Sequence, residues 1–165
     1  FLPMAFVAAV PSFFLAQLAQ KRVARTFGCT TEFRLQGKFL LISVLFAFLF
    51  RFVFAAPGIT QRFGPLTREG TLRMSAVVPL TFLAVGGAGV LAMAALAPAP
   101  GSYVWFLIHT TASVNSIMAA FSLLPVPGLP GADIWRTSKP FMAALIVATA
   151  AVFVALALLS GAPVI

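Results

Sequence analysis

Long apolar runs constrain the fold of this 165-residue chain more than any other feature of its sequence. A helix that crosses a bilayer needs about 20 predominantly apolar residues, because each residue advances it by only about 1.5 Å. Hydrophobic residues make up 61% of the chain, charged residues make up 8%, and the mean hydropathy is +1.07. This composition predicts an all-α polytopic membrane protein with four to five transmembrane or re-entrant segments. The apolar windows are 2–20, 39–56, 74–97, 104–124 and 140–159.

The chain is expected to form a single membrane domain over residues 1–165. No tandem repeat is visible, and the Pro- and Gly-rich connection at 125–140 is expected to be a loop. The first window is followed by basic residues from Lys21 onward instead of a small-residue cleavage site, so we expect a mature helix and not a signal peptide. Because the chain starts with Phe1, we expect a preceding segment to have been removed.

The basic residues predict how the windows are arranged across the membrane. If all five windows crossed, the basic residues would divide equally between the two sides. If the window 39–56 enters and leaves on the same face, all of them except Arg51 lie on one side, which the positive-inside rule favours. Arg51 would then lie at membrane depth, where a guanidinium must contact protein or reach water. The ten residues concerned are Lys21, Arg22, Arg25, Arg34, Lys38, Arg62, Arg68, Arg73, Arg136 and Lys139.

Two stripes of small residues predict close helix packing, within the chain or against a partner. The first stripe lies in the window 74–97 and the second in the window 140–159. The stripes consist of Ala84, Ala88 and Ala92, beside Gly86, Gly87 and Gly89, and of Ala144, Ala148, Ala151 and Ala155.

The net charge of +8 does not predict nucleic-acid binding, because the basic residues flank apolar spans and no soluble domain presents them. One cysteine excludes an internal disulfide.

The window 104–124 is rich in polar residues for a membrane span. His109, Ser113 and Ser116 are spaced so that they share one helix face. One hypothesis is that His109 is an axial ligand of a haem or chlorophyll. The alternative, which we favour, is that His109 is hydrogen-bonded across a helix interface or lies at the membrane surface beside Tyr103 and Trp105. Polar contacts are common between packed membrane helices, and Asn115 is a second candidate for one.

Several segments resemble the site-2 protease family of intramembrane zinc metalloproteases. Residues 16–21 read Ala-Gln-Leu-Ala-Gln-Lys where the family has His-Glu-x-x-His. Residues 124–131 read Leu-Pro-Val-Pro-Gly-Leu-Pro-Gly where the family has Pro-x-Pro-Leu-Asp-Gly. Residues 78–82 are similar to the family's Gly-Pro-Leu-Thr-Asn, with Val78 in place of the glycine and Phe82 in place of the asparagine.

The resemblance covers about residues 13–140 and implies a zinc site whose ligands are missing here. In the family, two histidines and an aspartate hold zinc, and a glutamate between the histidines activates water. The matching positions are Ala16, Gln20 and Pro130 for the ligands, and Gln17 for the base. Methyl, amide and pyrrolidine groups do not form a zinc site, and an amide cannot take a proton from water. The resemblance therefore implies a protein that is not an enzyme and holds no metal.

The remaining metal-ligating side chains are not expected to rebuild such a site. His109 is the single histidine, and Asp133 lies three residues after Pro130. One imidazole and distant carboxylates would need a coincidence of geometry to bind zinc. We expect Asp133 to cap the loop or to pair with Arg136.

These observations predict a catalytically inactive, site-2-protease-like accessory or assembly subunit of a larger membrane protein complex, of respiratory or photosynthetic type. Its expected partners are other integral membrane subunits and lipid, in the plasma membrane of a prokaryote or an energy-transducing membrane of an organelle. One alternative is a pseudoprotease that binds and shields or presents a transmembrane client. That alternative needs an open groove beside Gln17, Gln20 and Asn115, which Phe82 would otherwise fill. A further alternative is a haem- or chlorophyll-binding subunit that uses His109.

Overall fold

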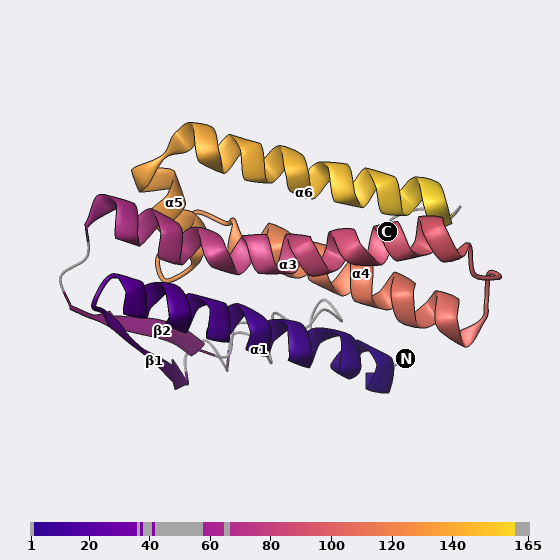
Figure 1. The fold of residues 1–165 in the computed structure, drawn as a ribbon, viewed down its shortest axis with the longest axis horizontal. Coiled ribbons are helices and arrows are strands. Elements are labelled where there is room, and N and C mark those ends of the chain that lie inside the picture. The colour runs from indigo at the N-terminus through magenta and orange to yellow at the C-terminus, as the bar shows by residue number, and fades with distance from the viewer. Residues whose placement is uncertain (1, 36, 38–40, 42–57, 65–66, 161–165) are drawn as a thin grey trace.

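The computed structural model describes residues 2–35, 37, 41, 58–64 and 67–160 (Figure 1). Apart from Leu41, the window 39–56 and its Arg51 lie outside the described residues. The other four windows each correspond to one long helix. The elements in chain order are α1 Leu2–Thr26, β1 Thr30–Leu35, β2 Gly58–Phe63, α3 Arg68–Leu96, α4 Tyr103–Ser122, α5 Pro130–Thr137 and α6 Lys139–Ser160.

Three of these helices, α3, α4 and α6, are long and apolar enough to cross a membrane. The chain is therefore a helical membrane protein, as its composition predicts. The N-terminal ends of α3 and α4 are fixed by hydroxyl caps, because the first N–H groups of a helix have no partner within it. Thr67 Oγ1 accepts a hydrogen bond from the Gly70 N–H at 3.1 Å, and Ser102 Oγ accepts one from the Trp105 N–H at 3.2 Å.

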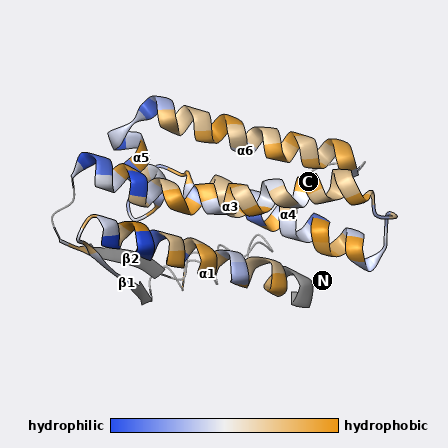
Figure 2. Cartoon of the chain, viewed as in Figure 1, coloured by the Kyte–Doolittle hydropathy of each residue, from blue (hydrophilic) through white to orange (hydrophobic). Residues whose placement is uncertain are grey.

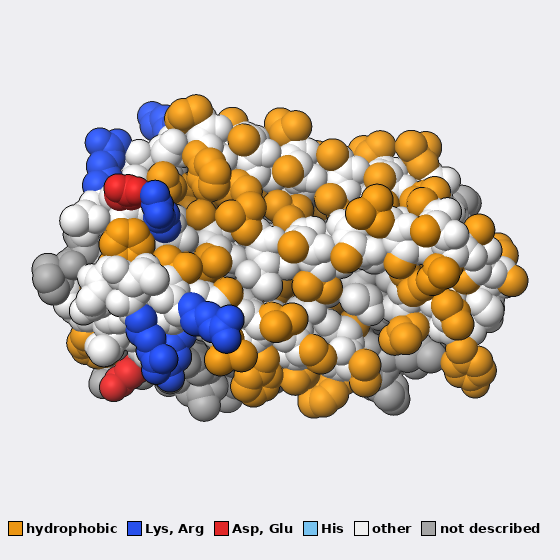
Figure 3. Space-filling model, viewed as in Figure 1, with side chains coloured by type: hydrophobic (Ala, Val, Ile, Leu, Met, Phe, Trp, Pro, Cys, Tyr) orange, Lys and Arg blue, Asp and Glu red, His pale blue; other side chains and the backbone are white. Residues whose placement is uncertain are grey.

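The long helices form a bundle in which α3 and α4 lie between α1 and α6 (Figure 1). Helices α1 and α4 run in one direction along the bundle and α3 and α6 in the other, so α1 begins and α6 ends at the same end. Hydrophilic residues gather at the opposite end, where α1 ends and α3 and α6 begin (Figure 2). We call this the basic end, because lysine and arginine side chains cluster there (Figure 3). Its described basic residues are Lys21, Arg22, Arg25, Arg68, Arg73, Arg136 and Lys139.

The contact between α3 and α4 depends on two glycines of α3. A Cβ on Gly89 would lie 2.9 Å from the Ala112 Cβ, and a Cβ on Gly86 would lie 3.1 Å from the Ser116 Oγ. Ala112 and Ser116 are fully buried. Residues three apart lie on the same helix face, so the two glycines together let the backbones of α3 and α4 approach closely.

The small-residue stripe of α3 packs within the chain through Gly86 and Gly89, whereas its alanines and the stripe of α6 do not. Ala84 and Ala88 of α3 are exposed, and the buried face of that helix instead carries Gly86 with larger residues such as Phe82 and Met93. The stripe of α6 also faces outward, since Ala144, Ala148 and Ala151 are exposed, while the residues that α6 buries are Met142, Leu145, Thr149 and Leu156. On helices that are apolar all round, composition does not specify which face packs.

Two shorter features supplement the long helices, and the second of them corrects the loop expected at 125–140. Strands β1 and β2 pair antiparallel from Thr30↔Phe63 to Leu35↔Gly58. The segment expected to be a loop contains α5, whose first residue is Pro130. Proline suits the first turn of a helix, since its fixed φ matches the helix and its missing N–H would have no partner there.

Gly89→Leu is expected to lower the free energy of unfolding by about 1–3 kcal/mol or more, because the added side chain overlaps Ala112 in a packed interface. Gly87→Leu is the matched control, since no described atom lies within 4 Å of a Cβ at that position. Circular dichroism during thermal or denaturant unfolding in detergent measures both variants. Equal stability of the two variants would contradict the packing described for α3 and α4.

Candidate functional site

The positions that the resemblance assigns to zinc chemistry lie on two helices. Ala16, Gln17 and Gln20 belong to α1, and Pro130 begins α5. Ala16 and Gln20 are one turn apart and are both buried, at 0% and 3% exposure, whereas Gln17 is half-buried. The helix therefore turns the two positions of the histidine pair inward, toward α3.

Ala16 lies in an apolar cluster that joins α1, α3 and α4. Its neighbours are Val78 and Phe82 of α3 and Ala119 of α4, all of them buried. Phe82 is only 4% exposed, so its ring lies inside the bundle against this cluster. Val78 and Phe82 are the α3 residues that depart from the family pattern toward larger, apolar side chains. Three departures from the pattern thus meet in one packed cluster.

Gln20 bridges α1 and α3 through a long hydrogen bond. Its Nε2 donates to the Met74 carbonyl oxygen at 3.4 Å. Its Oε1 is buried and accepts no hydrogen bond from the residues that the structure describes. A buried amide oxygen without a donor destabilises the folded state, since it has given up its hydrogen bonds to water. This amide is therefore an imperfectly satisfied polar group in an otherwise apolar interface.

The segment after α4 is held by close backbone contact and by two hydrogen bonds to α3. A Cβ on Gly131 would overlap the carbonyl groups of Leu123 and Leu124, so only glycine fits there. The Ser75 Oγ donates to the Asp133 Oδ2 at 3.1 Å, and the Arg68 guanidinium donates to the Thr137 carbonyl at 2.8 Å. These contacts fix α5 against the first turns of α3.

Gln20 and Asp133 therefore contact neighbouring residues of α3, at Met74 and Ser75, from two different helices. The side chains at the assigned positions do not suit zinc. Ala16 offers a methyl group inside an apolar cluster, Pro130 offers a ring at a helix start, and Gln20 offers one neutral amide. Within the described residues, no three His, Cys, Asp or Glu side chains lie close enough together to hold a metal ion.

The polar residues of α4 have separate environments. The Asn115 Nδ2 donates to the Thr111 carbonyl at 2.9 Å and, at 3.5 Å, to the Ala8 carbonyl of α1. Its buried Oδ1 accepts no hydrogen bond in the part of the chain that is described. The half-buried His109 ring stacks on Trp105, one turn earlier, with 4.7 Å between the ring centroids and 7° between the planes.

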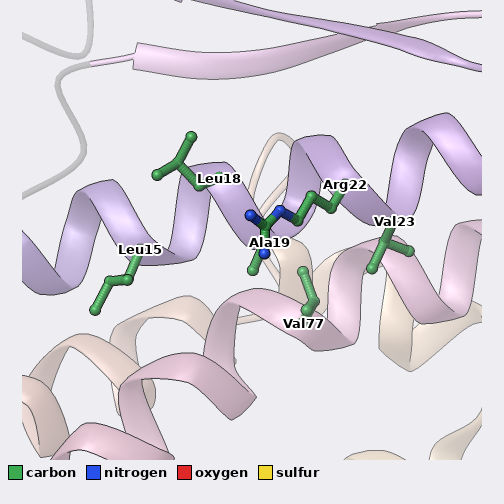
Figure 4. Close-up of a pocket in the computed structure, with 6 residues that line it drawn as sticks. All are labelled: Leu15, Leu18, Ala19, Arg22, Val23 and Val77. Carbon is green, nitrogen blue, oxygen red and sulfur yellow. The ribbon is translucent and has the colours of Figure 1, made fainter.

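An apolar pocket that the sequence did not reveal lies between α1 and α3 (Figure 4). Its volume is about 380 Å³. The α1 residues that line it recur at spacings of three and four, which places them on one helix face. That spacing was visible in the sequence, but the α3 residue that completes the pocket was not. The lining residues are Leu15, Leu18, Ala19, Arg22, Val23 and Val77.

Gln20→Met is expected to leave the free energy of unfolding unchanged or to raise it by up to about 1–2 kcal/mol, because it removes a buried acceptor without a donor and keeps the side-chain length. Gln20→Glu, of nearly identical shape, is expected to lower it by about 2 kcal/mol or more, because a buried carboxylate loses its hydration. Unfolding in detergent at neutral pH compares the two. A Met variant as unstable as the Glu variant would show that the amide stabilises the fold.

Comparisons with known proteins give one distant similarity. No protein-family model matches the chain, and no solved structure matches it. The chain is 27% identical over 144 residues to a Methanocaldococcus jannaschii protein named "Putative zinc metalloprotease", and the alignment covers 87% of this chain and 74% of that protein. This similarity supports a distant, protease-like relationship for a helical membrane protein whose assigned ligand positions carry alanine, glutamine and proline.

Proposed function

We propose that this chain is a catalytically inactive, site-2-protease-like protein that acts as a structural accessory or assembly subunit of a larger membrane protein complex. The cluster around Ala16 carries the proposal. Where the family resemblance places a zinc ligand, Ala16 is fully buried against Val78, Phe82 and Ala119. Apolar side chains therefore surround the position from which an imidazole would have to project. Restoring the ligands would require a different packing of α1 against α3.

The outward faces of the bundle support a role in protein–protein contact. One outward face of α6 combines small residues with exposed branched ones. Small residues let a neighbouring helix approach closely. Exposed fractions reach 68% at Val147, 58% at Val154 and 79% at Leu158. The outer α6 face consists of Ala144, Val147, Ala148, Ala151, Val154 and Leu158.

The pseudoprotease alternative needs a groove beside the assigned positions that could receive a client helix. Phe82 packs beside Ala16 inside the bundle, so a client helix would have to contact the outward-opening pocket along Leu18 and Ala19 instead. The stacked Trp105 and His109 rings of α4 neither favour nor require a haem or chlorophyll. An accessory subunit is the role that uses the outward faces and needs no chemistry at the filled site.

Extraction of the full chain from its native membrane in a mild detergent is expected to yield a stoichiometric complex with other integral membrane proteins. Native mass spectrometry gives the stoichiometry, peptide mass spectrometry identifies the partners, and elemental analysis of the same sample measures zinc. We expect less than one-tenth of a zinc ion per chain, since no ligand set remains at the assigned positions. A monomeric chain would refute the subunit proposal, and stoichiometric zinc in the isolated chain would refute the loss of the metal site.

Ala148→Phe is expected to reduce the amount of co-purifying partner about tenfold, because overpacking of a helix interface costs about 1–3 kcal/mol and 1.4 kcal/mol corresponds to a factor of ten. Leu158→Phe is the matched control, since it places the same ring at an already large, exposed residue of the same face. Both variants should retain the helical content of the natural chain. Full retention of partners by Ala148→Phe would place the interface away from the middle of α6.

A further inference from the structure

The pocket between α1 and α3 combines apolar walls with one cation. Leu15 and Leu18 are 52% and 56% exposed, so the pocket opens toward the outside of the bundle. Val77 of α3 forms the opposite wall, and Ala19 forms part of the floor. The Arg22 side chain extends back along α1 over Ala19, so that its guanidinium lies at the pocket (Figure 4). We call this site the Arg22 groove, and it comprises the lining residues given above.

Arg22 has no anionic partner among the residues that the structure describes. Within the described part of the chain, it makes no hydrogen bond and no ion pair. By contrast, Arg68 donates to the Thr137 carbonyl and Arg73 pairs with Glu69. A guanidinium beside an apolar surface is stabilised by an anionic partner that can accept its paired N–H donors. The groove therefore favours a ligand that joins an anion to an apolar chain.

The position of the groove along the bundle selects the kind of ligand. Arg22 belongs to the basic end, where Lys21 and Arg25 flank it in the sequence and the starts of α3 and α6 add further cations (Figure 3). Leu15 and Leu18 lie on the turns of α1 that lead away from this end, toward the apolar middle of the bundle (Figure 2). Basic sites at the ends of membrane helices attract anionic lipid headgroups, and the adjoining apolar surface lies at the depth of the acyl chains.

We propose that the Arg22 groove binds an anionic phospholipid, with an acyl chain against Leu15, Leu18 and Val77 and the phosphodiester held by the Arg22 guanidinium. Leu15 lies four residues, or about 6 Å along the helix axis, before Ala19, over which the guanidinium lies, so the apolar and cationic parts of the groove are adjacent along α1. The proposal is independent of the accessory-subunit role, since it concerns lipid on the flank formed by α1 and α3. The outer α6 face lies on the other side of the bundle (Figure 1).

Native mass spectrometry of the full chain, titrated in neutral detergent with dioleoyl phosphatidylglycerol, tests the proposal. The natural chain is expected to retain one molecule of this lipid and to bind dioleoyl phosphatidylcholine about tenfold more weakly, because the zwitterionic headgroup carries no net charge. Arg22→Gln is expected to weaken phosphatidylglycerol binding about tenfold, as loss of a charge-assisted hydrogen bond predicts. Arg25→Gln is the control, since it removes the same charge from the same helix end but does not line the groove.

Two further measurements distinguish lipid binding in the Arg22 groove from nonspecific electrostatic attraction to the basic end. Ala19→Phe fills the groove and leaves Arg22 in place, so it is expected to weaken lipid binding about as much as Arg22→Gln. Inorganic phosphate at millimolar concentration should not displace the lipid, because it lacks the apolar chain. Equal losses in Arg22→Gln and Arg25→Gln, or unchanged binding in Ala19→Phe, would overturn the proposal. So would a photo-crosslinker at Leu18 that labels a protein helix and no lipid in native membranes.

Discussion

The close approach of α3 and α4 is the contact on which the rest of the bundle depends. Gly86 and Gly89 remove the side-chain volume that would otherwise separate the two backbones, and Ala112 and Ser116 fit against them. Helices α1 and α6 pack on opposite sides of this pair (Figure 1). Lipid is as apolar as leucine, so the hydrophobic effect does little to bring membrane helices together, and close van der Waals contact must supply the attraction. The orientation of the α3–α4 pair therefore determines which residues α1 and α6 can meet.

In the cluster beside α1, a position that the family resemblance assigns to a zinc ligand is part of the packed core. Ala16 is smaller than a histidine, and Val78 and Phe82 are larger than the glycine and asparagine of the resembling family. Packed interiors tolerate a small residue best when a neighbour supplies the missing volume. The Oε1 of Gln20, one turn further along α1, is a buried polar atom that accepts no hydrogen bond from the described residues.

The bundle divides its surface between two kinds of environment. At the basic end, lysine and arginine side chains gather around the end of α1 and the starts of α3 and α6 (Figure 3). Along the rest of its length the exposed surface is apolar, with small residues on the outer α6 face and the Arg22 groove on the flank of α1. Such a body offers contacts to helices and to lipid, while its assigned metal positions are filled or neutral.

The sequence by itself determined the membrane character, the four described long helices and the residue types at the positions that the resemblance assigns to zinc, because apolar length and side-chain chemistry are local properties of the chain. Tertiary structure decided the rest. It selected Gly86 and Gly89 over Ala84 and Ala88 as the packing face, since helices that are apolar all round carry no periodic signal of their own orientation. It also formed α5 and the β1–β2 pair, whose short segments depend on contacts distant in sequence, such as Ser75 with Asp133. The packing of Phe82 beside Ala16 could not be predicted from the sequence either, because it depends on how α1, α3 and α4 meet in the folded structure.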